Sequence, residues 1–366
     1  MSFKPEDRRV SSRARIARAR ADMAKAKLDA LLVTDIKNIR YLTGFTGSSA
    51  YLVLTASRAY FLTDSRYALS AETEVKGLDV RICGKAIEEA AGILMGGRGN
   101  DRIGFEPDNL TYDAYLRFKK ALRDKRFKPS VNIIKAARAV KDRLETVAIS
   151  DSIRVLDAGF EAARGLIAPG IKETDAAFAI EAVFRKAGAT RPAFDTIIAS
   201  GPRSALPHGK AGDKKMRKHE LVVVDMGVQL NGYNSDETRT YCLGRPTRRQ
   251  KNIYDTVAVA QELAIKAIRP GVAAKDVDTA ARAHITNAGY GKYFGHGTGH
   301  GVGLDVHERP VLSPYSKDVL TQGMVVTVEP GIYIPGWGGV RIEDMVLVTD
   351  TGFEVLTSAS KGLEIL

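Results

Sequence analysis

The sequence predicts an α/β domain over residues 1–138 followed by an α+β domain over residues 139–366 with an internal repeat. Its length of 366 residues corresponds to about two domains. Charge divides the chain similarly: residues 1–140 hold 27 Lys and Arg against 16 Asp and Glu, and the remainder holds 28 against 27. Finally, a helix-ending pattern recurs 101 positions later in the second part, which indicates two copies of one unit.

Composition excludes several classes of protein. The chain is 44% hydrophobic and 27% charged, which is ordinary globular usage. No apolar run approaches the roughly 18–20 residues of a membrane span, and no apolar stretch follows the basic start as in a secretory signal. Cys83 and Cys242 lie far apart with no CxxC partner, which suits a reducing compartment. We therefore expect a soluble cytoplasmic protein with no membrane partner.

The basic N-terminus is predicted to be a helix. Six arginines fall between Arg8 and Arg20, while Ile16, Ala19 and Met23 recur with the helical period on the other face. Aromatic residues that would stack on bases do not interleave with the arginines. We interpret the arginines as a solvated face and expect no nucleic-acid partner.

The rest of the first domain alternates between short apolar runs and helical patterns. Three runs bounded by turn residues read as strands, and two amphipathic segments read as helices. The predicted strands are residues 28–34, 50–54 and 59–63, and the predicted helices are residues 86–94 and 112–122. The domain boundary is expected at residues 138–141, before a long helix that runs to about residue 167.

The second domain repeats a helix–helix–hairpin unit. One helix ends at Pro169-Gly170 and the next at Ala187-Gly188; the later counterparts are Pro270-Gly271 and Ala288-Gly289. A β-rich stretch with two acidic residues follows each helix pair: Asp225 and Asp236, then Glu329 and Glu343. Two copies packed about a pseudo-two-fold axis would bring the two acidic hairpins together.

The first hairpin has a defined register. Asn231-Gly232 is a strong two-residue hairpin signal, because both residues of that turn need positive φ. That turn places Asp225 opposite Thr238, and Asp236 is two residues from Thr238 on the same face. In the second hairpin Glu329 and Glu343 are each seven residues from Gly336, but the longer turn leaves their shared face open.

Four carboxylates in one cleft would repel one another and raise each other's pKa values. Two divalent cations would balance this charge, and a neutral histidine would suit the remaining ligand position. Four histidines are candidates: His208, His296, His300 and His307. The last three lie in a glycine-rich segment, residues 296–308.

The zincin motif HExxH is absent, because Val311 occupies the place of its second histidine. Oxygen ligands with one imidazole suit Mn²⁺, Co²⁺ or Zn²⁺. Two such ions would generate a hydroxide near neutral pH and stabilise an oxyanion, which describes a hydrolase. The residues do not choose the bond that is cleaved.

Five motifs together resemble one family. They are Asp225-Met226-Gly227, residues 235–240, residues 296–308, Val328-Glu329-Pro330-Gly331 and residues 340–344. This set resembles the pita-bread dinuclear metallopeptidases, in the branch that cleaves before proline: Xaa-Pro aminopeptidase (aminopeptidase P) and Xaa-Pro dipeptidase (prolidase). Residues 38–47 and 63–67 resemble the creatinase-like N-terminal domain of that branch, so the resemblance covers the whole chain.

The resemblance implies roles for these side chains. The implied metal ligands are Asp225, Asp236, His300, Glu329 and Glu343, with Asp236 and Glu343 bridging two ions, most simply Mn²⁺. Glu329 would also carry a proton from the bridging water to the leaving proline nitrogen. His307 and His208 would bind the substrate carbonyl, and His296 and Phe194 would line the substrate pocket. Arg341 would lie there too, supporting the metal carboxylates more than contacting substrate.

Two further enzymes and a binding protein are weaker readings. Methionine aminopeptidase shares the five ligands but not the N-terminal domain of about 138 residues or Thr238-Arg239-Thr240. Creatinase-like members act without metal and have lost the carboxylates that this chain keeps. The complete ligand set also argues against a non-enzymatic binding protein.

Within the proline branch, a dipeptidase needs a cation for the carboxylate of its substrate. Archaeal-type prolidases have an arginine where this chain has Val311, and Arg309 lies two residues earlier. With residues 44–49, which resemble small bacterial aminopeptidase P-like proteins, this predicts an Xaa-Pro aminopeptidase in which a metal-bridging hydroxide attacks the bond; prolidase is the alternative. The expected substrates are peptides with proline second, and the expected assembly is a homodimer whose N-terminal domain supplies the contacts and a cleft edge.

Overall fold

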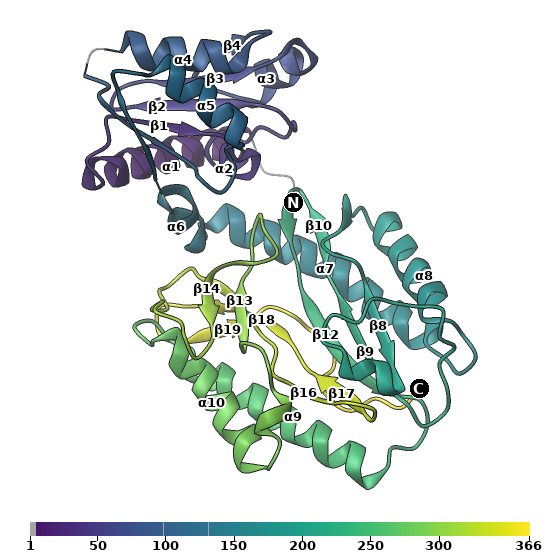
Figure 1. Cartoon of the computed structure of the whole chain (residues 1–366). Helices are drawn as coiled ribbons and strands as arrows, with labels where there is room; N and C mark the ends of the chain where they lie inside the picture. The colour runs from purple at the N-terminus through teal and green to yellow at the C-terminus, as the bar shows by residue number, and fades with distance from the viewer. Residues whose placement is uncertain (1–4, 98, 131) are drawn as a thin grey trace. The chain divides into compact units, whose positions relative to one another are not determined.

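The computed structural model describes the backbone of residues 5–97, 99–130 and 132–366, and side chains from residue 11 onward within these ranges. The chain divides into two compact units, the first ending at Arg138 and the second beginning at Ala139 (Figure 1). Each unit has its own sheets and its own apolar core.

The first unit contains a mixed six-stranded sheet with the order β4-β3-β2-β1-β5-β6. Its strands are β1 (Ala30–Val33), β2 (Tyr51–Thr55), β3 (Ala59–Thr63), β4 (Asp79–Ile82), β5 (Arg102–Phe105) and β6 (Arg126–Pro129). β1, β2 and β3 pair antiparallel, whereas β4, β5 and β6 join in parallel after crossovers that contain helices. This is the α/β architecture that the alternating pattern predicted.

Six α-helices accompany this sheet among the described residues: α1 (Pro5–Lys25), α2 (Ile36–Thr43), α3 (Ala68–Glu74), α4 (Ala86–Gly96), α5 (Tyr112–Ala121) and α6 (Ile133–Ala139). The predicted α1 is confirmed, since it buries Ile16, Ala19 and Met23. The short helix α2 was not predicted from the sequence. It begins at Asp35, whose carboxylate accepts the N–H of Lys37, and ends at Gly44 in the left-handed conformation.

The second unit begins with the predicted helix repeat. The first pair is α7 (Arg143–Leu166) and α8 (Glu173–Lys186), and the second pair is α9 (Arg248–Ala267) and α10 (Ala274–Asn287). Both long helices start with a reciprocal capping box, formed at Asp142 in α7 and at Thr247 in α9. Gly170 and Gly271 both have positive φ after the long helices, which explains why this glycine recurs in the sequence.

The strands of the second unit form two larger sheets and two small ones. The sheet of the first repeat contains β8 (Ile197–Ser200), β9 (Leu221–Met226) and β12 (Glu237–Cys242) in the order β12-β9-β8. The sheet of the second repeat has the order β14-β13-β15-β18-β19, from β13 (Gly299–Gly301), β14 (Glu308–Leu312), β15 (Val325–Val328), β18 (Asp344–Val348) and β19 (Phe353–Val355). The small sheets are β16 (Gly331–Ile334) with β17 (Gly338–Arg341), and β7 (Arg191–Pro192), β10 (Val228–Leu230) and β11 (Tyr233–Asn234).

Each repeat has a separate core. One core packs α7 and α8 on the sheet that contains β9, through residues such as Phe160, Phe184 and Val224. The other packs α9 and α10 on the sheet that contains β15, through residues such as Val257, Ile285 and Val326. In Figure 1, α9 and α10 run side by side along this sheet. The predicted α+β repeat is therefore confirmed, and among the described residues no helix has the length and apolar character to cross a bilayer.

Candidate metal centre

The first acidic hairpin has the register that the sequence predicted. Asp225 pairs with Thr238 in the β9–β12 ladder, and Leu230 pairs with Tyr233 next to the turn. Asn231 and Gly232 both have positive φ, at 51° and 82°, as the turn requires. Asp225 and Asp236 therefore lie near one another on one face, and both side chains are buried.

The second hairpin answers the question that its longer turn left open. Val328 pairs with Asp344 where β15 meets β18, and Gly331 pairs with Arg341 where β16 meets β17. The two ladders share one register, and within it Glu329 stands opposite Glu343. Directly opposite residues of an antiparallel pair face the same side, so these two carboxylates have a common direction.

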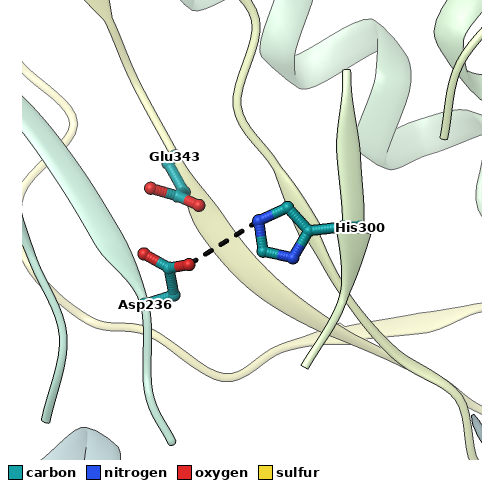
Figure 2. Close-up of side chains that lie close together, drawn as sticks. All are labelled: Asp236, His300 and Glu343. Atoms are coloured by element: carbon teal, nitrogen blue, oxygen red, sulfur yellow. Dashed lines mark ion pairs between the residues drawn. The ribbon is translucent and has the colours of Figure 1, made fainter. Parts of the chain in front are cut away.

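Three of the five predicted ligands form a compact group. Ligand atoms of Asp236, His300 and Glu343 all lie within 4.8 Å of one another (Figure 2). They come from three segments: the residue before β12, the strand β13, and the break between β17 and β18. The His300 Nε2 atom lies 3.7 Å from Asp236 Oδ2 and 3.2 Å from Glu329 Oε1, which brings the fourth predicted ligand to the same place.

The His300–Glu329 contact is an ion pair in the metal-free protein. Burial lowers the pKa of His300, but the hydrogen bond and charge of Glu329 outweigh it and raise that pKa to about 9. Burial raises the pKa of Glu329, and the same imidazolium outweighs it and lowers that pKa to about 2. A divalent cation between these groups would take the place of the His300 proton.

Asp225, the fifth predicted ligand, is held by an arginine. Arg341 Nη2 lies 2.5 Å from Asp225 Oδ2, and both side chains are buried. Arg341 Nη1 also donates to Tyr333 Oη at 2.8 Å, and this hydroxyl lies 2.9 Å from His296 Nε2. Arg341 thus contacts Asp225 directly and is connected through Tyr333 to His296, the predicted substrate residue.

Glu343 is held from the first repeat. The Thr238 hydroxyl donates to Glu343 Oε2 at 2.7 Å and accepts from Arg341 Nε at 3.0 Å. Burial, followed by the charge of nearby carboxylates, raises the pKa of Asp236 and of Glu343 well above the usual range. The raised pKa values mean that, without a further cation, the site favours the neutral, protonated form of these two carboxyl groups.

The remaining predicted residues lie at varying distances from this group. The ring centroid of His307 is 4.3 Å from that of His300. Burial lowers the pKa values of His296 and His307, and smaller electrostatic contributions, including one from His208, place His208 near both rings. The half-buried Phe194 packs against Gly227, two residues beyond Asp225.

Sequence reasoning missed two residues that organise the centre, Thr238 and Tyr333. Thr238 was already placed opposite Asp225, so its register alone could have identified it as a partner of the carboxylates. Tyr333 carries no such signal. Its hydroxyl is placed between Arg341 and His296 by the packing of β16 and β17 against other segments.

The residues present fit divalent cations. The donor set is oxygen-rich with one imidazole, as Mn²⁺, Co²⁺ and Zn²⁺ accept. Asp225 Oδ1 is buried and has no hydrogen-bond partner among the described residues, although such an atom normally has one. An unbonded carboxylate oxygen and two carboxylates with raised pKa values are expected where a cation completes the site.

The fold and this centre define a metallopeptidase. Residues 148–350 match the model of metallopeptidase family M24, and residues 15–140 match the creatinase/prolidase N-terminal domain. The first match covers more than half of the chain, so the protein belongs to this family of metallopeptidases. The family implies divalent metal ions, in agreement with the donor set of the centre.

Several similar proteins are named as enzymes that act on Xaa-Pro bonds. The chain is 40% identical over 342 residues to the Xaa-Pro dipeptidase of Pyrococcus horikoshii, covering 93% of this chain and 96% of that one. It is 41% identical to the solved Xaa-Pro dipeptidase from Bacillus anthracis, with TM-score 0.94 over 97% and 100% of the two chains. It is also similar to the X-Pro aminopeptidase from Thermotoga maritima, at 34% identity and TM-score 0.87 over 96% and 99%.

Proposed function

We propose that this protein is an Xaa-Pro aminopeptidase, which removes an N-terminal residue from peptides with proline second. The observation that carries the choice is the position of Val311. Val311 pairs with His300 in the β13–β14 ladder, so the two side chains project on one face, and Val311 is 44% exposed. An arginine there would reach the edge of the centre and could bind a free carboxylate.

The neighbouring Arg309 does not take the place of an arginine at position 311. Arg309 forms an ion pair with Asp318, and this carboxylate also accepts the N–H of Val311. The positive charge closest in sequence to Val311 is therefore engaged in holding its own strand. A cleft edge with an apolar residue here suits a substrate chain that continues beyond proline.

The five carboxylate and histidine ligands are proposed to hold two Mn²⁺ ions, which would activate a water molecule and polarise the peptide carbonyl. Asp225, Asp236, His300, Glu329 and Glu343 would hold these ions in neutral imidazole and carboxylate form. Arg341 and Thr238 would fix the orientation of Asp225 and Glu343. The proposed charge balance is four carboxylates against two dications.

The remaining chemistry falls to groups beside the ligands. An Xaa-Pro amide has no N–H, so the leaving nitrogen must receive a proton from elsewhere. Glu329 is proposed to carry it, because its half-buried carboxylate lies at the centre, 3.2 Å from His300 Nε2. His307 and His208 are proposed to bind the substrate carbonyl, with His296 beside the cleft. Glu329→Gln should lose about 10²–10³-fold in kcat while keeping part of its metal affinity.

The second candidate is an Xaa-Pro dipeptidase, favoured by the names of two close relatives. Under this alternative, a cation elsewhere would bind the substrate carboxylate. Turnover of Mn²⁺-loaded protein on Gly-Pro, Gly-Pro-Ala and the control Gly-Ala-Ala separates the candidates. We expect cleavage of Gly-Pro-Ala with little cleavage of Gly-Pro. The reverse preference would establish the dipeptidase, and loss of both proline substrates would remove the proposal.

Val311→Arg sharpens this test. The new guanidinium should improve kcat/KM for Gly-Pro by about tenfold, the value of one favourable charge-assisted contact, and leave Gly-Pro-Ala less affected. Val311→Met is the matched control, since it adds a long side chain without charge. Equal effects of the two substitutions on Gly-Pro would show that position 311 does not contact the carboxylate.

The native metal, a cytoplasmic homodimer and a contribution of the N-terminal unit to dimer contacts remain predictions. Light scattering of the purified protein tests the dimer directly. A monomer with full activity on Gly-Pro-Ala would rule out a required partner subunit. Comparison of Mn²⁺, Co²⁺ and Zn²⁺ on metal-free protein tests the choice of metal.

A further inference from the structure

The strand β12 presents different residues on its two faces. Thr238, and Asp236 just before the strand, face the metal centre, whereas Glu237 and Arg239 alternate with them and project to the opposite face. Both are nearly inaccessible, and Arg239 is among the largest fully buried side chains. A buried arginine normally needs a set of acceptors that uses most of its donors.

The acceptors of Arg239 include the backbone of a proposed metal ligand. Arg239 Nη1 donates to the carbonyl oxygens of Glu343 and of Thr238, the latter at 2.9 Å. The N–H of Glu343 donates in turn to the Thr238 carbonyl at 3.1 Å. Glu343 lies in the break between β17 and β18, so no strand ladder holds its carbonyl oxygen. Arg239 supplies the bond that a ladder would supply elsewhere.

The other donors of Arg239 reach the C-terminal segment. Nη2 donates to the Ala359 carbonyl at 2.7 Å, and Nε donates to the carbonyls of Ala359 and Ser360 at 3.1 and 3.0 Å. A planar guanidinium can bind several acceptors in a fixed arrangement, which an ammonium cannot do. One side chain thus joins the backbone of Glu343 to residues 359–360.

Charge holds this arginine in place. Arg239 Nη2 lies 2.6 Å from Glu237 Oε1 and 2.8 Å from Asp344 Oδ1. Asp344 follows Glu343 directly and also binds Lys361 at 2.9 Å and Thr357 at 2.9 Å. Residues 357–361 are therefore linked to Glu343 in two ways. They bind Asp344, which follows Glu343 in the chain, and they bind Arg239, which holds the Glu343 carbonyl.

We propose that Arg239 is a positioning residue for Glu343, and that residues 357–361 complete its setting from behind the metal centre. By holding the Glu343 carbonyl oxygen, Arg239 fixes the direction in which the Glu343 carboxylate points. This inference rests on the proposed role of Glu343 as a ligand. Partners of this kind typically change metal affinity by about 10- to 100-fold when removed.

The test is Mn²⁺ titration by calorimetry into metal-free protein, with thermal unfolding of each metal-free variant. Arg239→Lys keeps the positive charge but loses the planar set of N–H donors. We expect this variant to remain folded and its Mn²⁺ affinity to fall about 10- to 100-fold. The double variant Glu237→Gln/Arg239→Met removes one charge of each sign and should lose at least as much. It keeps the proposal testable if the single variant does not fold.

Arg164→Met is the matched control. Arg164 binds Glu364 at 2.7 and 2.9 Å, so it anchors the chain just beyond residues 357–361 without touching Glu343. We expect a lower unfolding temperature and unchanged Mn²⁺ affinity for this variant. Wild-type affinity in Arg239→Lys, or an equal loss in Arg164→Met, would overturn the proposal. The titration uses no peptide, so a protein that binds Mn²⁺ but cleaves no proline peptide would contradict the proposed function alone.

Discussion

The two acidic hairpins of the catalytic unit reach one centre by different means. In the first, a two-residue turn with positive φ at Asn231 and Gly232 sets a ladder in which Asp225 and Asp236 are diagonal neighbours. In the second, Glu329 and Glu343 stand opposite each other at a break between two ladders. The first pair therefore has one carboxylate within a strand, Asp225 in β9, and one at a break, Asp236, whereas both carboxylates of the second pair stand at a break.

The repeats support each other across the centre. Arg341 belongs to the second repeat and binds Asp225 of the first, while Thr238 belongs to the first and binds Glu343 of the second. For Asp225 and for Glu343, the side chain that supports the carboxylate therefore comes from the other copy. A duplicated fold can therefore evolve one shared centre instead of two.

The largest expected effect comes from removing Asp236, a carboxylate that is proposed to bind both ions. Asp236→Ala should lower kcat/KM for Gly-Pro-Ala by at least about 10³-fold, or ~4 kcal/mol of transition-state stabilisation. The protein should remain folded, because removing one of several mutually repelling carboxylates relieves charge. Steady-state kinetics and circular dichroism give the two readouts.

Asp213→Ala is the control, since its side chain is 87% exposed and pairs only with Lys172 among the described residues. It should match the wild type in both kinetics and folding. Wild-type turnover of metal-loaded Asp236→Ala would remove Asp236 from the ligand set.

The next largest effect should come from removing the contacts between the repeats, Arg341 with Asp225 and Thr238 with Glu343. Arg341→Met should reduce activity about 10- to 100-fold, because Asp225 loses its only cation among the described residues. Thr238→Val should cost about tenfold through the lost hydrogen bond to Glu343. The measurement is kcat/KM together with Mn²⁺ affinity.

Thr240→Val is the control for the bracing. Its hydroxyl bonds only the backbone of Arg341, with no contact to a carboxylate among the described residues. If Thr240→Val were as damaging as Thr238→Val, strand pairing rather than carboxylate support would explain both results.

The pH dependence of the metal-free protein follows from its raised pKa values. Asp236, Glu343 and His300 all have folded-state pKa values above the unfolded ones, that of His300 being about 9. Such groups contribute stability that is fully present below the unfolded pKa and is lost as pH rises through the folded pKa. The unfolding temperature of the metal-free protein should therefore fall as the pH rises from about 5 to about 9. The lower limit lies just above the unfolded carboxyl pKa values, and the upper limit is the folded-state pKa of His300.

Metal reverses the trend, because the ions bind only the deprotonated ligands. The increase in unfolding temperature on adding Mn²⁺ should grow over the same pH interval. An increase that is independent of pH would mean that the ions do not displace protons from this group.

The smallest effect is expected at the turn of the first hairpin. Gly232→Ala places a side chain at φ 82° and should cost about 1 kcal/mol in the free energy of unfolding. Because the ladder from Asp225 outward continues to fix the register, kcat should not change. Urea unfolding with kinetics checks both statements, and Gly336→Ala in the other hairpin, at φ 74°, is the comparison. A fall in kcat for Gly232→Ala alone would show that the turn, and not the ladder, holds the first carboxylate pair.

Much of the catalytic unit could be predicted because its signals are local. The Asn-Gly turn fixes the register of its own hairpin, and the Pro-Gly helix endings mark positions that need positive φ. The short helix α2 and the strands β4, β5 and β6 gave no comparable signal, because each has only a few residues and depends on the rest of the sheet.

The sequence by itself determined the two-part organisation, the repeat and the identity of the carboxylates and histidines, since these follow from periodicity, turn chemistry and residue type. Only the tertiary structure decided that Glu329 faces Glu343, that Arg341 and Thr238 brace the opposite repeat, and that Arg239 holds the Glu343 backbone. The contacts made by Arg341, Thr238 and Arg239 join residues about a hundred positions apart in the chain. Their partners are chosen by how the two repeats pack, and no local pattern records that packing.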